Sequence, residues 1–359
     1  MILKILVIWF LIFVCTLKTN AQVYEHKYYL KAELAITNIQ YSTIDQSGPI
    51  EIWEKEMGIP GFLSYFLQDK KKISLKMDNY RVRDSQKRPV LVLIHGGAFL
   101  PGFGDYRSEV NLELAYQFAQ RGYSVFSIEY RLMDLLTPSF VKAGYAASQD
   151  AKAALRYITA NHNQLNIDPN NIFISGISAG GFTALNAGYL DDDDNIANRT
   201  QKLQDMYGCQ ECAGDNLGVA YKLKGIINIV GGVYDVNQFN NNPNIPVINF
   251  HGDNDDIVPY GCGMPFEKYS KEYQTFISSL KIVVKGNKFL LDKLGEADLL
   301  SVCGSSVIDL SLRRMGKTSS LYTVPGGDHS LLLGDDKRLS RTGSMIVVEM
   351  SRFMFGRIK

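Results

Sequence analysis

The sequence has few cysteines, few histidines and no excess of charge of either sign. Its 359 residues include five cysteines and five histidines, and its formal net charge is +1. A nearly neutral chain offers no general basic surface, so we expect neither nucleic acid nor an anionic membrane as a partner. We also find no internal repeat. The chain is long enough to bury a sizeable core as one decorated domain.

The apolar run at the amino end is too short to indicate a membrane span. It covers residues 5–14, follows a lysine and precedes the small or polar residues 19–21, whereas a spanning helix needs about 20 apolar residues. This pattern is typical of a secretion signal. We therefore expect residues 1–21 to be cleaved, residues 22–359 to be secreted or periplasmic, and no stable membrane insertion afterwards. An uncleaved anchor is the alternative.

The cysteines beyond the amino-terminal segment predict structural disulfides. In an oxidising compartment these four residues can form two bridges, with three possible pairings. Cys209 and Cys212 have a spacing also seen in zinc and redox sites, but no second close pair of ligands and no thioredoxin-like context accompany them. We therefore expect no metal. The four cysteines are Cys209, Cys212, Cys262 and Cys303.

A serine between glycines stands where an apolar run meets a helix-forming one. The segment Gly176–Gly180 reads GISAG, follows the strand-like residues 171–175 and precedes the helix-forming residues 181–187. A sharp strand-to-helix elbow needs small neighbours, and it projects the serine oxygen into a cleft beside a helix N-terminus. Ser178 is therefore the candidate nucleophile.

A second glycine-rich turn follows another buried strand. Residues 89–94 are continuously apolar and end in HGGAF at residues 95–99. Acyl transfer needs hydrogen-bond donors where the tetrahedral oxyanion forms, and such a turn can aim backbone amides there. We predict that the amides of Gly97, Ala98 and Ala179 form this oxyanion hole. The alternative is that the glycines only make a tight turn.

A nucleophilic serine needs a base, and His329 is the best placed histidine. It lies in the glycine-containing loop 325–330 after the strand-like residues 321–324, where it can face Ser178. An imidazole ordinarily titrates near pH 6.5, which suits a general base at neutrality. The alternative is a solvated loop histidine. The other histidines lie near the mature N-terminus, after a helix, in the glycine turn and at the start of a loop: His26, His162, His95 and His251.

The acid is expected between the serine and the histidine in the chain. Residues 246–250 predict a strand, and the following segment, His251–Pro259, contains three aspartates. The residue pattern alone leaves Asp253, Asp255 and Asp256 as candidates. A cation-binding loop is a further reading, although the segment lacks the spacing of a calcium hand.

Together these motifs resemble the α/β-hydrolase superfamily, and within it secreted or lipase-like carboxylesterases with an HGG[GA]F turn. The likeness covers roughly residues 70–350 and includes residues 124–132 and 149–158, which are similar to a strand and a helix of the family. The spacing His-Gly-x-x-Asp-x-x-Val-Pro in segment 251–259 is similar to the family's acid loop. The resemblance implies a triad of Ser178, Asp255 and His329, with the oxyanion hole formed by Gly97, Ala98 and Ala179. Many relatives have a third glycine in place of Ala98, but an alanine amide can also donate.

Apolar and helical stretches alternate along the chain, which predicts an α/β fold with a mostly parallel sheet and catalytic loops at the carboxyl ends of the strands. Residues 191–220 and 262–320 are additional to a minimal sheet, as lids or as plain surface insertions. Strands are expected near 73–82, 90–94, 124–129, 172–175, 225–230, 247–250 and 321–324, and helices at 109–121, 143–161, 181–190, 266–280 and 341–354.

The predicted function is a secreted serine hydrolase of carboxylic esters. Short acyl chains are favoured and carbohydrate esters are included, and triad chemistry needs only water, so no cofactor is expected. One alternative is a serine peptidase of the prolyl oligopeptidase type, although the roughly 50 residues before the predicted sheet leave no room for its large N-terminal domain. The other is a non-catalytic binding protein on the same fold. The sequence indicates no oligomeric state.

Overall fold

A computed structural model of the chain describes residues 24–46, 71–133, 139–194, 196, 199–240, 243–269 and 300–358. The expected signal segment, residues 1–21, lies outside the described residues. The same is true of most of the helix expected at 266–280, whose described start forms the short 3-10 helix η5 (Glu267–Tyr269).

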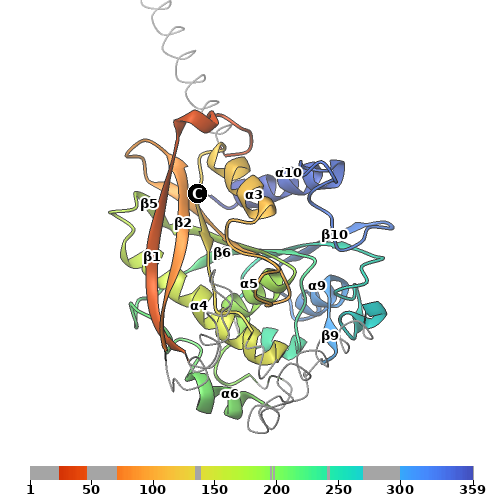
Figure 1. The fold of residues 1–359 in the computed structure, drawn as a ribbon. Coiled ribbons are helices and arrows are strands. Elements are labelled where there is room, and N and C mark those ends of the chain that lie inside the picture. The colour runs from red at the N-terminus through yellow and green to blue at the C-terminus, as the bar shows by residue number, and fades with distance from the viewer. Residues whose placement is uncertain are drawn as a thin grey trace, which may run out of the picture.

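An eight-stranded sheet lies at the centre of the described chain (Figure 1). Its strands are β1 (Leu34–Gln46), β2 (Lys71–Val82), β3 (Arg88–Ile94), β4 (Ser124–Ile128), β5 (Ile167–Ile177), β6 (Leu223–Ile229), β7 (Val247–Gly252) and β10 (Ser319–Val324). They are ordered β1-β2-β4-β3-β5-β6-β7-β10. From β4 to β10 neighbouring strands are parallel, whereas β2 pairs antiparallel with both β1 and β4. The predicted α/β class with a mostly parallel sheet is therefore confirmed.

Each face of the sheet has its own hydrophobic core, because side chains alternate along a strand. In β3, Val90 and Val92 belong to one core, and Leu91 and Leu93 belong to the other. The first core is covered by α4 (Phe140–Ala160), α5 (Ala179–Tyr189) and α9 (Ser305–Arg314). The second is covered by α3 (Glu109–Ala119) and α10 (Arg341–Phe355), which lie together on the other side of the sheet (Figure 1).

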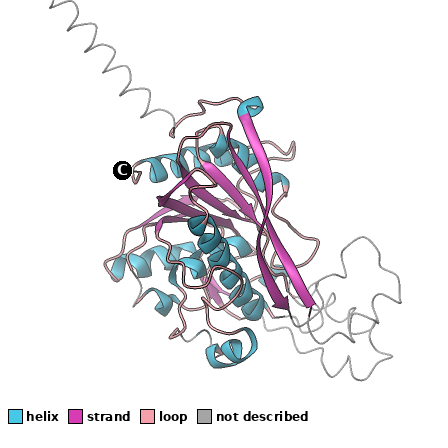
Figure 2. Cartoon of the chain, turned by 90° about the vertical axis from the view of Figure 1, so that its left-hand side faces the viewer, coloured by secondary structure: helices cyan, strands magenta, loops and turns pink. Residues whose placement is uncertain are grey.

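The sheet begins earlier than the sequence pattern predicts. The sequence indicates a first strand near residues 73–82, whereas β1 pairs along the whole of β2 and forms with it the long twisted ribbon in Figure 2. β1 is an edge strand with many exposed positions, and even Ile36 is 52% exposed, so its apolar signal is weak. Similarly, β5 starts at Ile167, ahead of the strand expected near residues 172–175.

The two stretches predicted as insertions contain elements of their own. α6 (Thr200–Tyr207) lies in the first stretch, and β8 (Cys262–Gly263), β9 (Val302–Cys303) and α9 lie in the second. α9 packs against β7 and β10, and its Ile308 and Leu312 are fully buried. This part of the second stretch therefore belongs to the core of the domain. Two short 3-10 helices complete the described elements, η1 (Lys31–Glu33) and η4 (Val236–Phe239).

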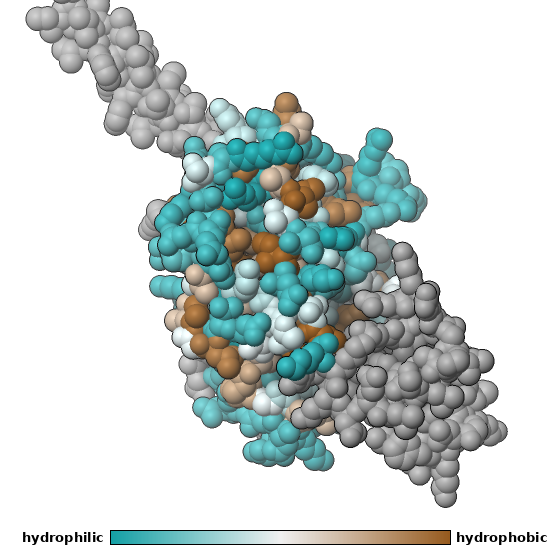
Figure 3. Space-filling view, turned by 60° about the vertical axis from the view of Figure 1, so that its left-hand side comes forward, coloured by the Kyte–Doolittle hydropathy of each residue, from teal (hydrophilic) through white to brown (hydrophobic). Residues whose placement is uncertain are grey.

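No described helix is both long enough and apolar enough to cross a membrane. Among the described residues, no three or more histidine, cysteine, aspartate or glutamate side chains are grouped so that they can hold a metal ion. The face shown in Figure 3 is mostly hydrophilic and carries small, separate groups of hydrophobic residues.

Candidate active site

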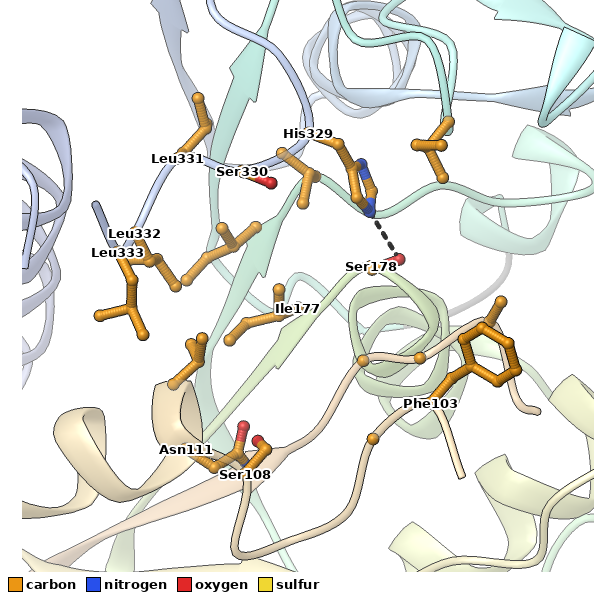
Figure 4. A pocket seen from close by; sticks show the side chains of 18 residues that line it. Phe103, Ser108, Asn111, Ile177, Ser178, His329, Ser330, Leu331, Leu332 and Leu333 are labelled. Carbon is orange, nitrogen blue, oxygen red and sulfur yellow. Dashed lines mark hydrogen bonds between the residues drawn. The ribbon is translucent and has the colours of Figure 1, made fainter. Parts of the chain in front are cut away.

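Three residues predicted from distant parts of the sequence meet at the carboxyl ends of three strands. Ser178 follows β5, Asp255 follows β7 and His329 follows β10. His329 Nε2 lies 2.9 Å from Ser178 Oγ, and His329 Nδ1 lies 2.7 Å from an Asp255 carboxylate oxygen. Figure 4 shows the imidazole pointing at the serine across the head of the β5–α5 turn. This arrangement is able to pass a proton from the serine to the histidine.

The turn that carries Ser178 is fixed by its glycines. Ser178 has φ 55°, a conformation that residues other than glycine rarely adopt, and its amide donates to the Ile229 carbonyl at 2.8 Å. A Cβ on Gly176 would clash with the Gly180 carbonyl, and a Cβ on Gly180 would clash with the end of β3. The strand therefore turns directly into α5, and the serine oxygen stands at the helix N-terminus.

The predicted oxyanion turn has an unusual backbone over three consecutive residues. Gly97, Ala98 and Phe99 have φ values of 110°, 53° and 59°. A Cβ on Gly97 would lie 2.9 Å from the backbone of Phe103, so only glycine fits there. Among the described residues, the amides of Gly97, Ala98 and Ala179 have no hydrogen-bond partner. All three are therefore free to donate to a ligand.

His95 anchors this turn and is not placed as a second base. Burial lowers the pKa of His95 to about 4, so its ring is neutral at physiological pH. The ring stacks on Tyr130 with centroids 4.3 Å apart, and Tyr130 Oη donates to the His95 carbonyl at 2.9 Å. Tyr130 thus holds the start of the oxyanion turn, a role that the sequence analysis missed.

The Asp255 carboxylate is fully buried and accepts hydrogen bonds at both oxygens. Oδ1 accepts from the amides of Ile257 at 2.9 Å and Val258 at 3.0 Å, and Oδ2 faces His251 at 3.2 Å and His329 at 2.7 Å. Burial alone raises the pKa of the Asp255 carboxyl, but the hydrogen bonds from the two histidines outweigh it and hold the pKa well below its ordinary value. The group is therefore ionised and oriented toward His329.

The neighbouring aspartates have other partners. Asp253 is exposed, and its Oδ1 accepts from the Gly326 amide at 2.6 Å, in the loop that carries His329. Asp256 lies 3.4 Å from the Lys268 ammonium group. Of the three candidate acids, Asp255 is the one placed against His329.

His251 is a further polar residue of the site that the sequence analysis missed. The sequence suggests that it opens a loop, whereas it lies inside β7 with no exposed surface. Its ring faces the Ser305 hydroxyl on one side and Asp255 on the other. The four-residue spacing between His251 and Asp255 was the available signal.

Two cavities meet at Ser178. The larger has a volume of about 490 Å³, is open to solvent, and is lined by His329, the loop after it and the N-terminal end of α3. Phe103, which is 70% exposed, also lines it (Figure 4). The smaller has a volume of about 30 Å³. Its walls are mainly aromatic and apolar, with side chains that include Phe99, Phe140, Phe182, Tyr234 and Phe266.

The four cysteines among the described residues form two disulfides. Cys209 pairs with Cys212, and Cys262 pairs with Cys303. The second bridge joins β8 to β9, and Cys303 also exchanges two backbone hydrogen bonds with Val233 at 2.8 and 2.9 Å. Val302, the neighbour of Cys303, lines the smaller cavity, so this bridge supports one of its walls. Two disulfides are consistent with an extracytoplasmic protein.

Solved structures of similar proteins share this fold. A solved thermophilic esterase from the planctomycete Thermogutta terrifontis, in its propionate-bound form, superposes with a TM-score of 0.50 at 16% identity, over 78% of this chain and 88% of that one. The chain has the α/β-hydrolase fold. The butyrate-bound form of that esterase gives a TM-score of 0.48 at 16% identity, with the same coverage.

Sequence similarity adds to the structural likeness. Residues 77–242 match the family model BD-FAE, a range that includes the oxyanion turn and Ser178 but ends before Asp255 and His329. Venom carboxylesterase-6 of Apis mellifera is 35% identical over 105 residues, which are 28% of this chain. The chain thus spans 18% of the length of that relative. The chain is thus similar to esterases in its fold and, over part of its length, in its sequence.

Proposed function

We propose that the protein is a serine hydrolase that cleaves carboxylic esters through an acyl-enzyme. The observation that carries this proposal is the position of His329, 2.9 Å from Ser178 Oγ and 2.7 Å from Asp255 Oδ2. An ionised acid at Nδ1 keeps the proton on that nitrogen, and Nε2 is then an acceptor for the serine proton.

In the proposed reaction, Ser178 Oγ attacks the ester carbon while its proton passes to His329 Nε2. The amides of Gly97, Ala98 and Ala179 donate to the resulting oxyanion. When the ester C–O bond breaks, the alcohol leaves with the proton from Nε2 and the acyl group stays on Ser178. Water, deprotonated by His329, then attacks the acyl-enzyme and releases the acid.

The two cavities are suited to different halves of the ester. His329 has to protonate the departing alcohol, so the alcohol lies on the side of the imidazole. That side is the larger cavity, because His329 lines it. The acyl group then enters the smaller cavity, which is lined by Ala98, Ala179 and Phe182.

The size of the smaller cavity supports short acyl chains. A volume of about 30 Å³ holds about one or two water-sized groups beyond the ester carbon, which fits acetyl and propionyl groups. The larger cavity combines apolar walls with the polar side chains of Ser108, Asn111 and Ser330. Such a mixture suits a bulky, partly polar alcohol, and sugars are one such class.

We further propose that the protein acts outside the cytoplasm after loss of its first 21 residues. The signal-like amino end and the two disulfides support this location. Mass spectrometry of the extracytoplasmic protein is expected to give a chain beginning at residue 22. A protein found only in the cytoplasm with its amino end intact would contradict the proposal.

The test of the activity is hydrolysis of a series of p-nitrophenyl esters by the purified protein, with Ser178→Ala as the control. We expect turnover of the acetate and propionate esters, a steep fall from butyrate to hexanoate, and no turnover by Ser178→Ala, which keeps its thermal stability. A fluorophosphonate probe is expected to label Ser178. Absence of both labelling and turnover would favour a non-catalytic protein, and preference for peptide substrates would favour a peptidase.

A further inference from the structure

A second imidazole contacts the acid of the proposed triad. His251 Nε2 lies 3.2 Å from Asp255 Oδ2, the same oxygen that His329 Nδ1 approaches at 2.7 Å. The side chains of His251 and Asp255 are both 0% exposed. Because a buried polar group has to be hydrogen-bonded, the direction of each bond around His251 is set by its neighbours.

A backbone carbonyl fixes the orientation of the polar side chains that lead to His251. Asn249 donates through its Nδ2 to the Ser320 carbonyl at 3.3 Å, so its Oδ1 is the acceptor. Asn228 Nδ2 donates to that oxygen at 3.0 Å and also to Ser305 Oγ at 3.2 Å. Ser305 Oγ is therefore an acceptor toward Asn228, and its own hydrogen is available for another partner.

That partner is His251. Its Nδ1 lies 2.7 Å from Ser305 Oγ, so the hydroxyl donates and Nδ1 accepts. An imidazole that accepts at Nδ1 carries its hydrogen on Nε2, which faces the Val258 carbonyl at 3.1 Å and the Asp255 oxygen. The single hydrogen on Nε2 is shared between these two acceptors, so from Asn228 to Asp255 every bond points in one direction, and such chains strengthen each member.

We propose that His251, held in one tautomer by Ser305, is a positioning residue that fixes the Asp255 carboxylate for its action on His329. This inference rests on the proposed function of the triad. Two donors share the charge of one oxygen, so the carboxylate keeps its orientation and attracts the proton of His329 less strongly than it would with one donor.

Few titratable groups surround this buried chain of hydrogen bonds. From the loop after β7, Asp255 and the ring of Tyr260 face His251, and the centroid of the Tyr260 ring is 5.8 Å from that of His251. α9 contributes the Ser305 hydroxyl, and the loop after β10 contributes His329 through Asp255. A change in the pH profile on substitution of His251 is therefore expected to come from the Asp255–His329 pair.

The experiment compares His251→Phe with the parent protein by pH profiles of p-nitrophenyl acetate hydrolysis. The phenyl ring keeps the volume but removes the donor, so kcat is expected to fall about tenfold with KM unchanged, the size of one hydrogen bond to a charged group. The midpoint of the acidic limb of kcat/KM is expected to move upward by about half a pH unit, because Asp255 then holds the proton on His329 more strongly.

Matched variants separate this role from a purely structural one. His251→Gln keeps an amide nitrogen near the position of Nε2 and is expected to restore most of kcat and the parent profile. Ser305→Ala removes the donor that fixes the tautomer of His251. It is expected to move the midpoint of the acidic limb upward, but by less than His251→Phe does. Tyr260→Phe keeps the ring beside His251 and is expected to leave the limb unchanged.

Active-site titration with a fluorophosphonate distinguishes loss of folded protein from loss of rate. If His251→Phe shows fewer titrated active sites but an unchanged midpoint of the acidic limb, the substitution has only reduced the amount of folded protein. That result would overturn the inference. If that variant does not fold, an unmoved limb in Ser305→Ala would do the same. If the parent hydrolyses no ester, the proposed function fails, whereas the inference is still decided by imidazole ¹⁵N NMR, in which hydrogen on Nδ1 of His251 would contradict it.

Discussion

Asp253 Oδ1 accepts a hydrogen bond from the Gly326 amide at 2.6 Å, and this bond joins the loop after β7 to the loop after β10. The first loop carries Asp255 and the second carries His329. The distance between the proposed acid and base is therefore set partly by a residue that touches neither. A Cβ on Gly252 would also clash with Gly327, which shows how closely the two loops approach.

Asp253→Ala is expected to lower kcat several-fold with little effect on KM, because the His329 loop loses one anchor while the substrate cavities keep their walls. Asp253→Asn retains an acceptor oxygen and is expected to behave like the parent. Steady-state kinetics on p-nitrophenyl acetate measures both. Equal losses in the two variants would show that the negative charge, and not the hydrogen bond, is what matters.

Phe182→Ala is expected to extend the range of acyl chains. Phe182 is buried and lines the smaller cavity beside Ser178, so its removal makes room for butyryl and hexanoyl groups. The substitution is also expected to lower the free energy of unfolding by about 3 kcal/mol. The ratio of kcat/KM for hexanoate to that for acetate measures the change in selectivity.

Phe103→Ala is the matched control for that variant. Phe103 lines only the larger cavity and is 70% exposed. Its removal is expected to leave the acyl-length profile unchanged and to raise KM for acetate esters of bulky alcohols. A change of acyl preference in this variant would mean that the halves of the ester are assigned to the wrong cavities.

Loss of the Cys262–Cys303 bridge is expected to affect both stability and selectivity. These cysteines are 41 residues apart, so in a chain-entropy account the bridge contributes up to about 4 kcal/mol, against about 2 kcal/mol for Cys209–Cys212 with a separation of 3. Replacing each pair by serine and measuring unfolding in urea tests which bridge contributes more to stability. Only replacement of the Cys262–Cys303 pair is expected to broaden acyl preference, since its neighbour Val302 lines the smaller cavity.

Asp194→Asn is expected to stabilise the protein above pH 6. Burial raises the pKa of Asp194 to about 6, so the folded protein holds this proton more tightly than the unfolded chain does. The associated stability is complete below the ordinary carboxyl pKa of about 3.9 and is lost as the pH rises through about 6. Thermal unfolding is expected to show a higher Tm for Asp194→Asn at pH 7.5 and no difference at pH 3.5.

The exposed neighbour Asp193 provides the comparison for this prediction. Asp193→Asn is expected to change Tm little at either pH, because its carboxyl is in solvent. If the difference in Tm between Asp194→Asn and the parent is the same at both pH values, the effect comes from packing and not from ionisation.

The sequence predicted the residues whose roles depend on short local patterns. GISAG and HGGAF each combine a strand end with glycines, so the positions of Ser178 and the oxyanion turn follow from backbone requirements. Their convergence with His329 follows from the parallel sheet, whose carboxyl ends share one edge. The geometry of the site agrees with these expectations, while the catalytic roles stay predictions.

Other features depend on contacts between segments and left no local pattern. β1 lies at an exposed edge and its polar and apolar residues do not alternate regularly, so its signal is weak until it is seen paired with β2. Ser305, a partner of His251, comes from α9 and is itself held by Asn228 of β6, and nothing in the sequence of β7 indicates either residue. Likewise, Asp253 has a partner only because the β10 loop lies beside it.

The proposed nucleophile and one wall of the smaller cavity share a single helix. Ser178 caps α5, and Phe182 lies one turn further along it, whereas the larger cavity is bounded mainly by loops after β3 and β10 and by the start of α3. Substitutions in that wall therefore also disturb the helix that positions the Ser178 hydroxyl. If the proposed function holds, changes in the alcohol that is accepted are free of that constraint, so proteins descended from this one are expected to diverge in the alcohol they release sooner than in the acid.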